Sequence, residues 1–421
     1  MEKDKNTDNK IVLVKIFAAS ETPWGKDAAL LWKGPGNDRL TMRYGKCRSG
    51  VMKRFVMLDG RPLLKWRHRG DGETAAEHFL SSGKCVELHE NEILNILSPE
   101  AGFEYEGAAS FKKISGFLEM LETGLYILTE FDHFPADLNG RFFWDFSREN
   151  SGYRHIGHQI SPMAAYPAFL YPAFSETMFC DERVKHYQKM ISSGAQLTAL
   201  AFYFDEYASI ILDGHHRAAA SFLEGVKIRC TTVVPCSGYK FVNDKTTHFC
   251  FAGMAVPVNA VHSSMIDQSS ISGERYKIDH HAVSKLDAID AGGGTSDGLM
   301  ADLKSASGFF PPLNVVEGAD IIGDFSDENI RAIIDGEGSE KMMLQEILFD
   351  VLDGFSDPRT FAVAKELALS ERHSHLWEKA FAYLSNFKNA EVEDIFVKFI
   401  VGDDGRRPNL TKIANDYFET K

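Results

Sequence analysis

One five-residue turn constrains the fold of this chain more than any other segment: Asp213-Gly214-His215-His216-Arg217. An apolar run at 208–212 precedes the turn and predicts a buried strand, and an alanine-rich run at 218–223 follows it and predicts a short helix. The first N–H groups of a helix have no partner inside it, and the helix dipole favours negative charge there. A strand that leads through a polar turn into a helix therefore predicts an anion-binding site.

The side chains of this turn have chemistry that suits such a site. Gly214 lets a ligand approach the backbone closely, and the planar guanidinium of Arg217 suits phosphate or carboxylate. Asp213 can hold a metal ion or a donor group, and His215 and His216 can donate, accept or carry protons. The alternative is a polar turn that caps its own helix and leaves both histidines on the surface.

The flanking residues predict an ordered set of elements around the turn. A helix is expected over 181–194, because apolar side chains recur on one face, Asp181 can cap its start and Gly194 can end it. The apolar run at 198–204 predicts a buried strand, and the alternation at 228–234 predicts a closing strand. The expected order is helix, strand, turn, strand, polar loop, helix, strand.

This order of elements resembles the ParB/sulfiredoxin superfamily over residues 160–240. The segment ILDGHHRAAASFLEGVKIRCTTVV, at 211–234, is most similar to the branch that contains the free serine kinases. The resemblance implies that the polar loop cradles nucleotide phosphates. It also implies a base, and Glu176 stands at about the position of the family glutamate that accepts the proton of the acceptor hydroxyl. The entry segment at 164–174 is richer in aromatic residues and proline than is usual in the family, which leaves the substrate open.

The resemblance implies a nucleotide-dependent phosphotransferase that uses ATP or ADP with Mg²⁺ and acts on a small hydroxyl compound, with free serine as the candidate. Nucleotide binding is assigned to Gly214, His215, His216 and Arg217. The catalytic roles are assigned to Glu176, Asp213 and His216, and Asp213 is also the metal ligand. Two alternatives remain open: a ParB-like, nucleotide-gated DNA-binding protein or nuclease, and a nucleotide-sensing scaffold.

Composition bounds the class of protein. A formal net charge of −14 at pH 7 disfavours a protein whose surface binds nucleic acid broadly. No stretch of the sequence reaches the ~18 consecutive apolar residues of a membrane span. The polar residues 1–10 are expected to form a disordered tail without a secretion signal, so a cytoplasmic location is expected. The six cysteines include no C-x-x-C pair and are expected to be free thiols.

A basic stretch at 41–70 departs from this acidic balance. Asp59-Gly60 within it predicts a two-residue hairpin turn. In such a hairpin the numbers of two opposite residues sum to 119, so Arg54 would lie opposite Lys65. Arg67 would lie one step beyond Lys65 on the same face of the hairpin. Like charges so placed repel one another unless acidic side chains or a phosphate-bearing ligand compensate, and both interpretations stay open.

The fold class predicted for the whole chain is α+β with five segments. After the tail, a mixed α/β N-terminal region is expected at 11–150 and the ParB/sulfiredoxin-like domain at 151–245. An irregular region with a glycine-rich loop follows at 246–324, and a helical domain similar to HEAT-type repeats at 325–421. Such an array binds protein or braces a neighbouring domain. Within these segments, a helix is expected at 110–121, the aromatic residues at 142–146 are expected in the core, and His373 and His375 are expected to be solvated.

Overall fold

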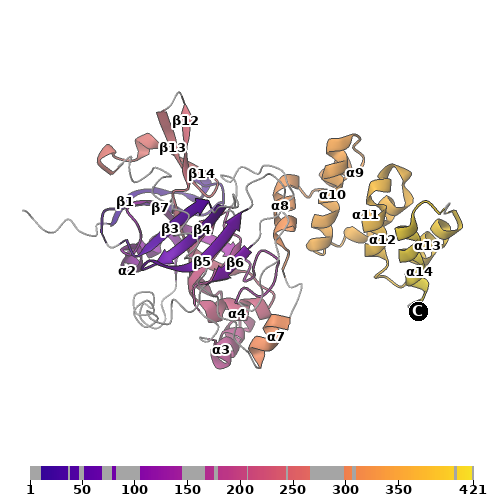
Figure 1. The fold of residues 1–421 in the computed structure, drawn as a ribbon, viewed down its shortest axis with the longest axis horizontal. Coiled ribbons are helices and arrows are strands. Elements are labelled where there is room, and N and C mark those ends of the chain that lie inside the picture. Colours follow the sequence, from indigo (N-terminus) through magenta and orange to yellow (C-terminus); the bar gives the residue numbers. More distant parts are fainter. Residues whose placement is uncertain are drawn as a thin grey trace, which may run out of the picture. The chain divides into compact units, whose positions relative to one another are not determined.

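A computed structural model of the chain describes twelve ranges of residues: 11–36, 38–46, 52–68, 78–81, 105–144, 166–174, 179–205, 207–242, 245–265, 298–305, 310–402 and 405–419. Internal contacts divide the chain into two compact units, at 1–313 and 314–421. The first unit holds the sheets, and the second is helical (Figure 1). The disordered tail expected at 1–10 lies outside the described residues.

The first unit is built on a seven-stranded mixed sheet. Its strands, in spatial order, are β1 (Ile11–Phe17), β2 (Ala28–Lys33), β7 (Gly124–His133), β11 (Ile228–Pro235), β9 (Thr198–Asp205), β10 (Ala208–Asp213) and β8 (Phe169–Pro172). The β9–β11 and β8–β10 pairs are parallel, and the other neighbours are antiparallel. The strands expected around the turn are confirmed, because their apolar residues are buried in the middle of this sheet.

The boundary that we expected near residue 150 does not separate two folding units. Strand β7 pairs with β11 from Tyr126↔Pro235 to His133↔Ile228, so residues from both sides of that boundary form one sheet. The cause lies in β11, which has a strand partner along both of its edges. Its amide and carbonyl groups would be unsatisfied on one side without β7.

Two helices cover the part of the sheet that carries the turn. Helix α3 (Asp181–Ser192) joins β8 to β9, and α4 (His215–Leu223) joins β10 to β11. The two helices pack against each other (Figure 1). The expected helix at 181–194 is confirmed, although its N-cap is Cys180 and not Asp181.

The helix expected at 110–121 is replaced by two shorter elements. A 3₁₀ helix, η3, covers Gly107–Lys112, and a single turn of α-helix, α2, covers Ser115–Leu118. Gly116 within this segment weakens a continuous helix, because glycine loses more backbone entropy on folding than any other residue.

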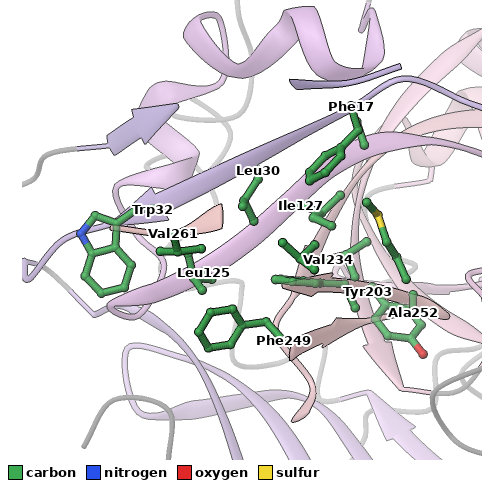
Figure 2. Packing of buried hydrophobic residues seen from close by; sticks show 14 of the residues in the cluster. Phe17, Leu30, Trp32, Leu125, Ile127, Tyr203, Val234, Phe249, Ala252 and Val261 are labelled. Carbon is green, nitrogen blue, oxygen red and sulfur yellow. The ribbon is translucent and has the colours of Figure 1, made fainter. Parts of the chain in front are cut away.

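A hydrophobic core lies between the large sheet and a three-stranded sheet of β12 (Gly238–Val242), β13 (Lys245–Phe251) and β14 (Met254–Pro257). Figure 2 shows Phe249 of the small sheet among Leu125, Ile127 and Val234 of the large one. All four side chains are nearly or fully buried. Burial of aromatic and branched side chains contributes roughly 1.5–3 kcal/mol each, so this packing stabilises the unit that positions the turn.

The basic stretch forms part of a four-stranded sheet of β3 (Leu40–Lys46), β4 (Met52–Leu58), β5 (Arg61–His68) and β6 (His78–Ser81). The hairpin turn at Asp59-Gly60 is confirmed, since both residues have positive φ, at 48° and 77°.

The predicted register of this hairpin is wrong beyond its first two pairs. A bulge between Val56 and Met57 shifts the pairing by one residue, so Arg54 lies opposite Trp66 and not opposite Lys65. The bulge lies beside Pro62, which has no amide hydrogen to donate to a regular ladder.

The second unit consists of helices, as expected from the sequence for 325–421, but its first helix lies in the region at 246–324 that we expected to be irregular. They are α8 (Leu313–Ile322), α9 (Asp327–Ile334), α10 (Ser339–Gly354), α11 (Thr360–Leu369), α12 (Trp377–Leu384), α13 (Ala390–Gly402) and α14 (Pro408–Glu419), with the 3₁₀ helix η8 (Glu371–Leu376) before α12. Consecutive helices pack against each other from α9 to α12. Among the described residues, no helix combines the length and apolar character needed to cross a membrane.

The expectation that His373 is solvated is wrong. Its side chain is 1% exposed, and Nε2 lies 2.9 Å from the carbonyl oxygen of Ile334 at the end of α9. The amide of Gln345 in α10 donates to the carbonyls of Ile333, Ile334 and Gly336 at 2.9–3.0 Å. These side chains satisfy carbonyl groups that have no partner inside α9, which is why they are buried.

Candidate functional site

The turn at the end of β10 is tighter than the sequence predicts. Asp213 is the last residue of the strand, Gly214 is the N-cap of α4 with φ 100° and ψ 19°, and α4 begins at His215. The helix therefore starts three residues earlier than expected, so that His215, His216 and Arg217 form its first turn. A residue with a side chain rarely adopts the φ of Gly214, and this requirement explains the glycine.

Gly214 also makes a close approach to the neighbouring strand. A Cβ atom placed on it would lie 2.7 Å from Cβ of Ala199 in β9 and 3.2 Å from Nε of Arg217. Since Gly214 has no side chain, the N-cap position supplies no acceptor for the first N–H groups of α4. The start of α4 thus lies against the sheet and keeps the anion-attracting character of a helix N-terminus.

Three side chains form a polar cluster beside this helix start. Oδ2 of Asp213 accepts hydrogen bonds from the hydroxyl of Tyr105 and from Nη2 of Arg217, both at 2.6 Å. The guanidinium carbon of Arg217 lies 5.8 Å from the centre of the Tyr105 ring, a cation–π distance. The cluster therefore holds the Arg217 guanidinium at the first turn of α4.

Ionisation in this cluster is set by burial and by charge. Burial, with Asp213 as the second cause, raises the pKa of Tyr105, so the phenol stays a hydrogen-bond donor at neutral pH. Burial acts to lower the pKa of Arg217, but Asp213, Tyr105 and Tyr187 together outweigh it and the net shift is upward. The site thus contains a fixed cation next to a carboxylate.

Tyr105 is a member of the cluster that the sequence did not reveal. Its backbone N–H donates to Oγ1 of Thr198 in β9 at 3.2 Å, and Gly107 N–H donates to Oγ1 of Thr231 in β11 at 2.9 Å. These bonds place the segment before η3 across the sheet and bring Tyr105 to Asp213, 108 residues away in the chain. No local pattern marks such a contact.

The two histidines of the turn are buried, at 5% exposed for His215 and 7% for His216. Nε2 of His215 accepts hydrogen bonds from the N–H groups of Ala173 and Phe174, at 3.2 and 3.4 Å. Nε2 of His216 accepts one from the N–H of Cys180, at 3.0 Å. The alternative interpretation of two surface histidines is therefore wrong, because both rings bind backbone groups of the connection between β8 and α3.

Aromatic side chains enclose the two imidazoles. The ring of Trp144, which is fully buried, lies 4.9 Å from His215 and 5.3 Å from His216 between ring centres. Its Nε1–H donates to the carbonyl of Phe174 at 2.9 Å. The predicted core role of the aromatic residues is confirmed for Phe142, Phe143 and Trp144, and Phe146 lies outside the described residues.

The predicted site residues therefore fall into three groups. Asp213 and Arg217 pair with each other and with Tyr105, whereas His215 and His216 point their Nε2 atoms at backbone N–H groups. Glu176 lies outside the described residues, so its role stays a prediction. Residues 291–297 of the glycine-rich loop lie outside them as well.

The potential for metal binding rests on a single carboxylate at the turn. Within the described ranges, no three or more His, Cys, Asp or Glu side chains gather closely enough to form a metal cage. The cysteines in these ranges are free thiols, as expected: Cys180, Cys230, Cys236 and Cys250.

Comparisons of the chain with known protein families, with characterised proteins and with solved structures find no match. The fold is therefore described by its own topology, as a mixed α/β unit together with a helical unit. The proposed function rests on the chemistry of the turn between β10 and α4.

Proposed function

We propose that this chain is a nucleotide-dependent phosphotransferase that acts on a small hydroxyl compound, with free serine as the candidate acceptor. One observation carries the proposal: Gly214 starts α4 in a conformation that only glycine adopts readily, with Arg217 beside it. A helix start of this kind attracts anions through N–H groups that have no partner inside the helix and through its dipole. Because the turn resembles that of the free serine kinase branch, we infer that the anion is a nucleotide phosphate.

In this proposal the phosphates of ATP or ADP lie at the first turn of α4. The missing side chain of Gly214 lets the start of α4 pack against Ala199 of β9 and leaves Nε of Arg217 close to the backbone. The guanidinium of Arg217 has five N–H donors in one plane, so it can hold Asp213 and a phosphate together. The ion pair with Asp213 keeps the fork oriented before the nucleotide arrives, which lowers the entropic cost of binding.

The donor set at the turn fits Mg²⁺ better than a cation that needs an all-protein cage. Mg²⁺ keeps several water ligands and is commonly bound by one or two carboxylates together with substrate phosphates. Asp213 supplies such a carboxylate at the start of α4. A bound Mg²⁺ would neutralise charge on the phosphates, and Asp213 would be its protein ligand.

The proposed transfer joins the acceptor hydroxyl to the terminal phosphorus. The hydroxyl oxygen forms the new P–O bond, the bond between that phosphorus and the nucleotide breaks, and the nucleotide leaves with the electron pair. The hydroxyl proton passes to the carboxylate of Glu176, the base that the resemblance implies. Arg217 and the N–H groups of α4 stabilise the negative charge on the transferred group.

Nucleotide titrations of variants at Arg217 test this proposal. We expect Arg217→Ala to weaken the binding of ATP or ADP, each with Mg²⁺, by roughly 1.5–3 kcal/mol, the range for a charge-assisted hydrogen bond. Arg217→Lys keeps the charge near Asp213 but lacks the planar fork, so it should recover only part of the affinity. Arg183→Ala, at an exposed position of α3, is the matched control. Isotherms that are identical for all four proteins would contradict a phosphate site at this turn.

A turnover assay separates the proposed enzyme from its two alternatives. Phosphorylated serine, detected by mass together with loss of ATP or ADP, is expected only for a phosphotransferase. Nucleotide binding without turnover on any small hydroxyl compound would favour the nucleotide-sensing scaffold. Nucleotide-dependent binding or cleavage of DNA would favour the ParB-like alternative.

A further inference from the structure

We infer that His215 and His216 are positioning residues that tether the two ends of the connection between β8 and α3 to the first turn of α4. The described ends of this connection are Ala173–Phe174 and Phe179–Cys180. The sequence suggested that both rings bind nucleotide, whereas their hydrogen bonds point to a role inside the protein. The inference deepens the proposed function, and its kinetic part rests on that function.

His216 makes the clearer tether. Its Nε2 accepts the N–H of Cys180 at 3.0 Å, and Cys180 is the N-cap residue of α3. The second residue of α4 thus binds the N-cap residue of the neighbouring helix. The rings of Trp144 and Phe179 lie against this imidazole, at 5.3 and 6.1 Å between centres, and the imidazole is buried. A hydrogen bond to a buried ring nitrogen is costly to break, because the nitrogen then loses its partner.

His215 holds the other end of the same connection. Its Nε2 receives the N–H of Phe174 at 3.4 Å and shares the N–H of Ala173, which also points at the carbonyl of Ile211 in β10. Trp144 adds a second link at this end through its bond to the carbonyl of Phe174. Adjacent residues of one helix therefore hold both ends of a connection that leaves β8 and enters α3.

These bonds require neutral imidazoles. A ring nitrogen that accepts an N–H carries no proton, so in each ring the single proton of the neutral form resides on Nδ1. Neutral rings whose Nε2 atoms face backbone donors cannot also use those atoms to bind phosphate.

The tethers join the two chain segments that carry the proposed catalytic groups. Asp213 and Arg217 lie in the same turn as the histidines, and Glu176, the proposed base, belongs in sequence to the tethered connection. Loss of a tether should therefore slow phosphoryl transfer without weakening nucleotide binding. A direct contact between the histidines and the nucleotide would lower nucleotide affinity instead.

Hydrogen exchange at the Cys180 amide, followed by NMR in the full-length chain, tests the tether without reference to activity. We expect His216→Ala to speed this exchange by about tenfold or more, as for loss of one buried hydrogen bond. His216→Gln can present an acceptor oxygen near the position of Nε2, so it should restore much of the protection. His186→Ala, at an exposed position of α3, is the control, and the amides of Ile210 and Ile211 in β10 report any general loss of stability. Unchanged exchange at Cys180 in His216→Ala would overturn the inference.

The wild-type protein offers a second measurement should His216→Ala fail to fold. Nitrogen NMR of the imidazoles at pH 7.5 should show Nε2 of His215 and His216 without a proton and Nδ1 with one. Protonated Nε2 atoms would exclude the acceptor role and with it the tethers.

Kinetics then distinguish a failure of the tether from a failure of the proposed function. With nucleotide and serine, kcat of His216→Ala should fall about 10–100-fold, as for a misplaced catalytic group, with nucleotide Kd unchanged and partial recovery in His216→Gln. A weaker nucleotide Kd in both variants would show direct contact and refute the tether. If the wild type shows no turnover while Cys180 exchange responds as expected, the proposed function fails and the tether stands.

Discussion

His133, the last residue of β7, should lower the free energy of unfolding of the first unit in mild acid. Its side chain is fully buried, with Nε2 3.2 Å from Oγ of Ser209 and Nδ1 3.3 Å from the carbonyl oxygen of Phe131. Burial lowers the pKa of His133 to about 4, and Lys227 acts in the same direction. The Phe131 carbonyl and Asp132 oppose the shift but do not cancel it.

The sign and size of the effect follow from proton linkage. In the unfolded chain the histidine has a pKa of about 6.5, so below that pH the unfolded state binds a proton that the folded state does not. The free energy of unfolding therefore falls as the pH drops from 6.5 towards 4. At about 1.4 kcal/mol per pKa unit, the loss approaches ~3 kcal/mol at its limit and is about 2 kcal/mol at pH 5. The lowered pKa of His215 adds to the loss in the same direction.

Urea unfolding at pH 7.5 and pH 5 measures this loss. The methyl NMR signal of Ile127, buried in β7, reports unfolding of the large sheet. Between the two pH values the wild type should lose about 2 kcal/mol more than His133→Gln, whereas the exposed His186→Gln should behave as the wild type. Equal pH dependence in wild type and His133→Gln, or an imidazole of His133 that titrates near 6.5, would refute the argument.

Two further substitutions test close contacts. Gly214→Ala should cost roughly 2–4 kcal/mol, since it adds overpacking against Ala199 to the strain of positive φ, whereas Gly194→Ala, with φ 89° and nothing within 4 Å, should cost only about 1–2 kcal/mol. Thermal unfolding compares the two, and equal losses would show that the contact with Ala199 relaxes freely. Gln345→Ala should cost about 1–3 kcal/mol and speed hydrogen exchange in α9, because it leaves carbonyls at the helix end without their donor. Unaltered hydrogen exchange in α9 would mean that water replaces the side-chain amide of Gln345 as the donor.

Local patterns predicted the elements whose structure depends on nearby residues. The strand at 198–204 was recognised because its side chains after Thr198 are apolar or aromatic, and the hairpin turn was recognised because Asp59 and Gly60 tolerate positive φ. The glycine requirement at the start of α4 was also visible in the sequence, although the first residue of the helix was not. The helix propensity of histidine is intermediate, so it neither favours nor excludes a helix that begins at His215. Helix propensity alone therefore could not locate the start of α4.

Register and burial could not be predicted in the same way. A single bulge beside Pro62 moved every later pair of the basic hairpin by one residue, and alternation of side chains gives no sign of it. His373 looked like a surface residue because it is polar and lies near a helix start. It is buried because the carbonyl of Ile334, 39 residues away, needs a donor.

The sequence by itself determined that a strand, a glycine and a helix meet at Asp213–Arg217, since each depends on side chains within a few residues. The tertiary structure alone decided which groups meet there. It brought Tyr105 to Asp213, turned His215 and His216 toward backbone N–H groups, and joined β7 to β11 in one sheet. The reason is physical: buried donors and acceptors must find partners, and the folded chain supplies those partners from residues far away in sequence.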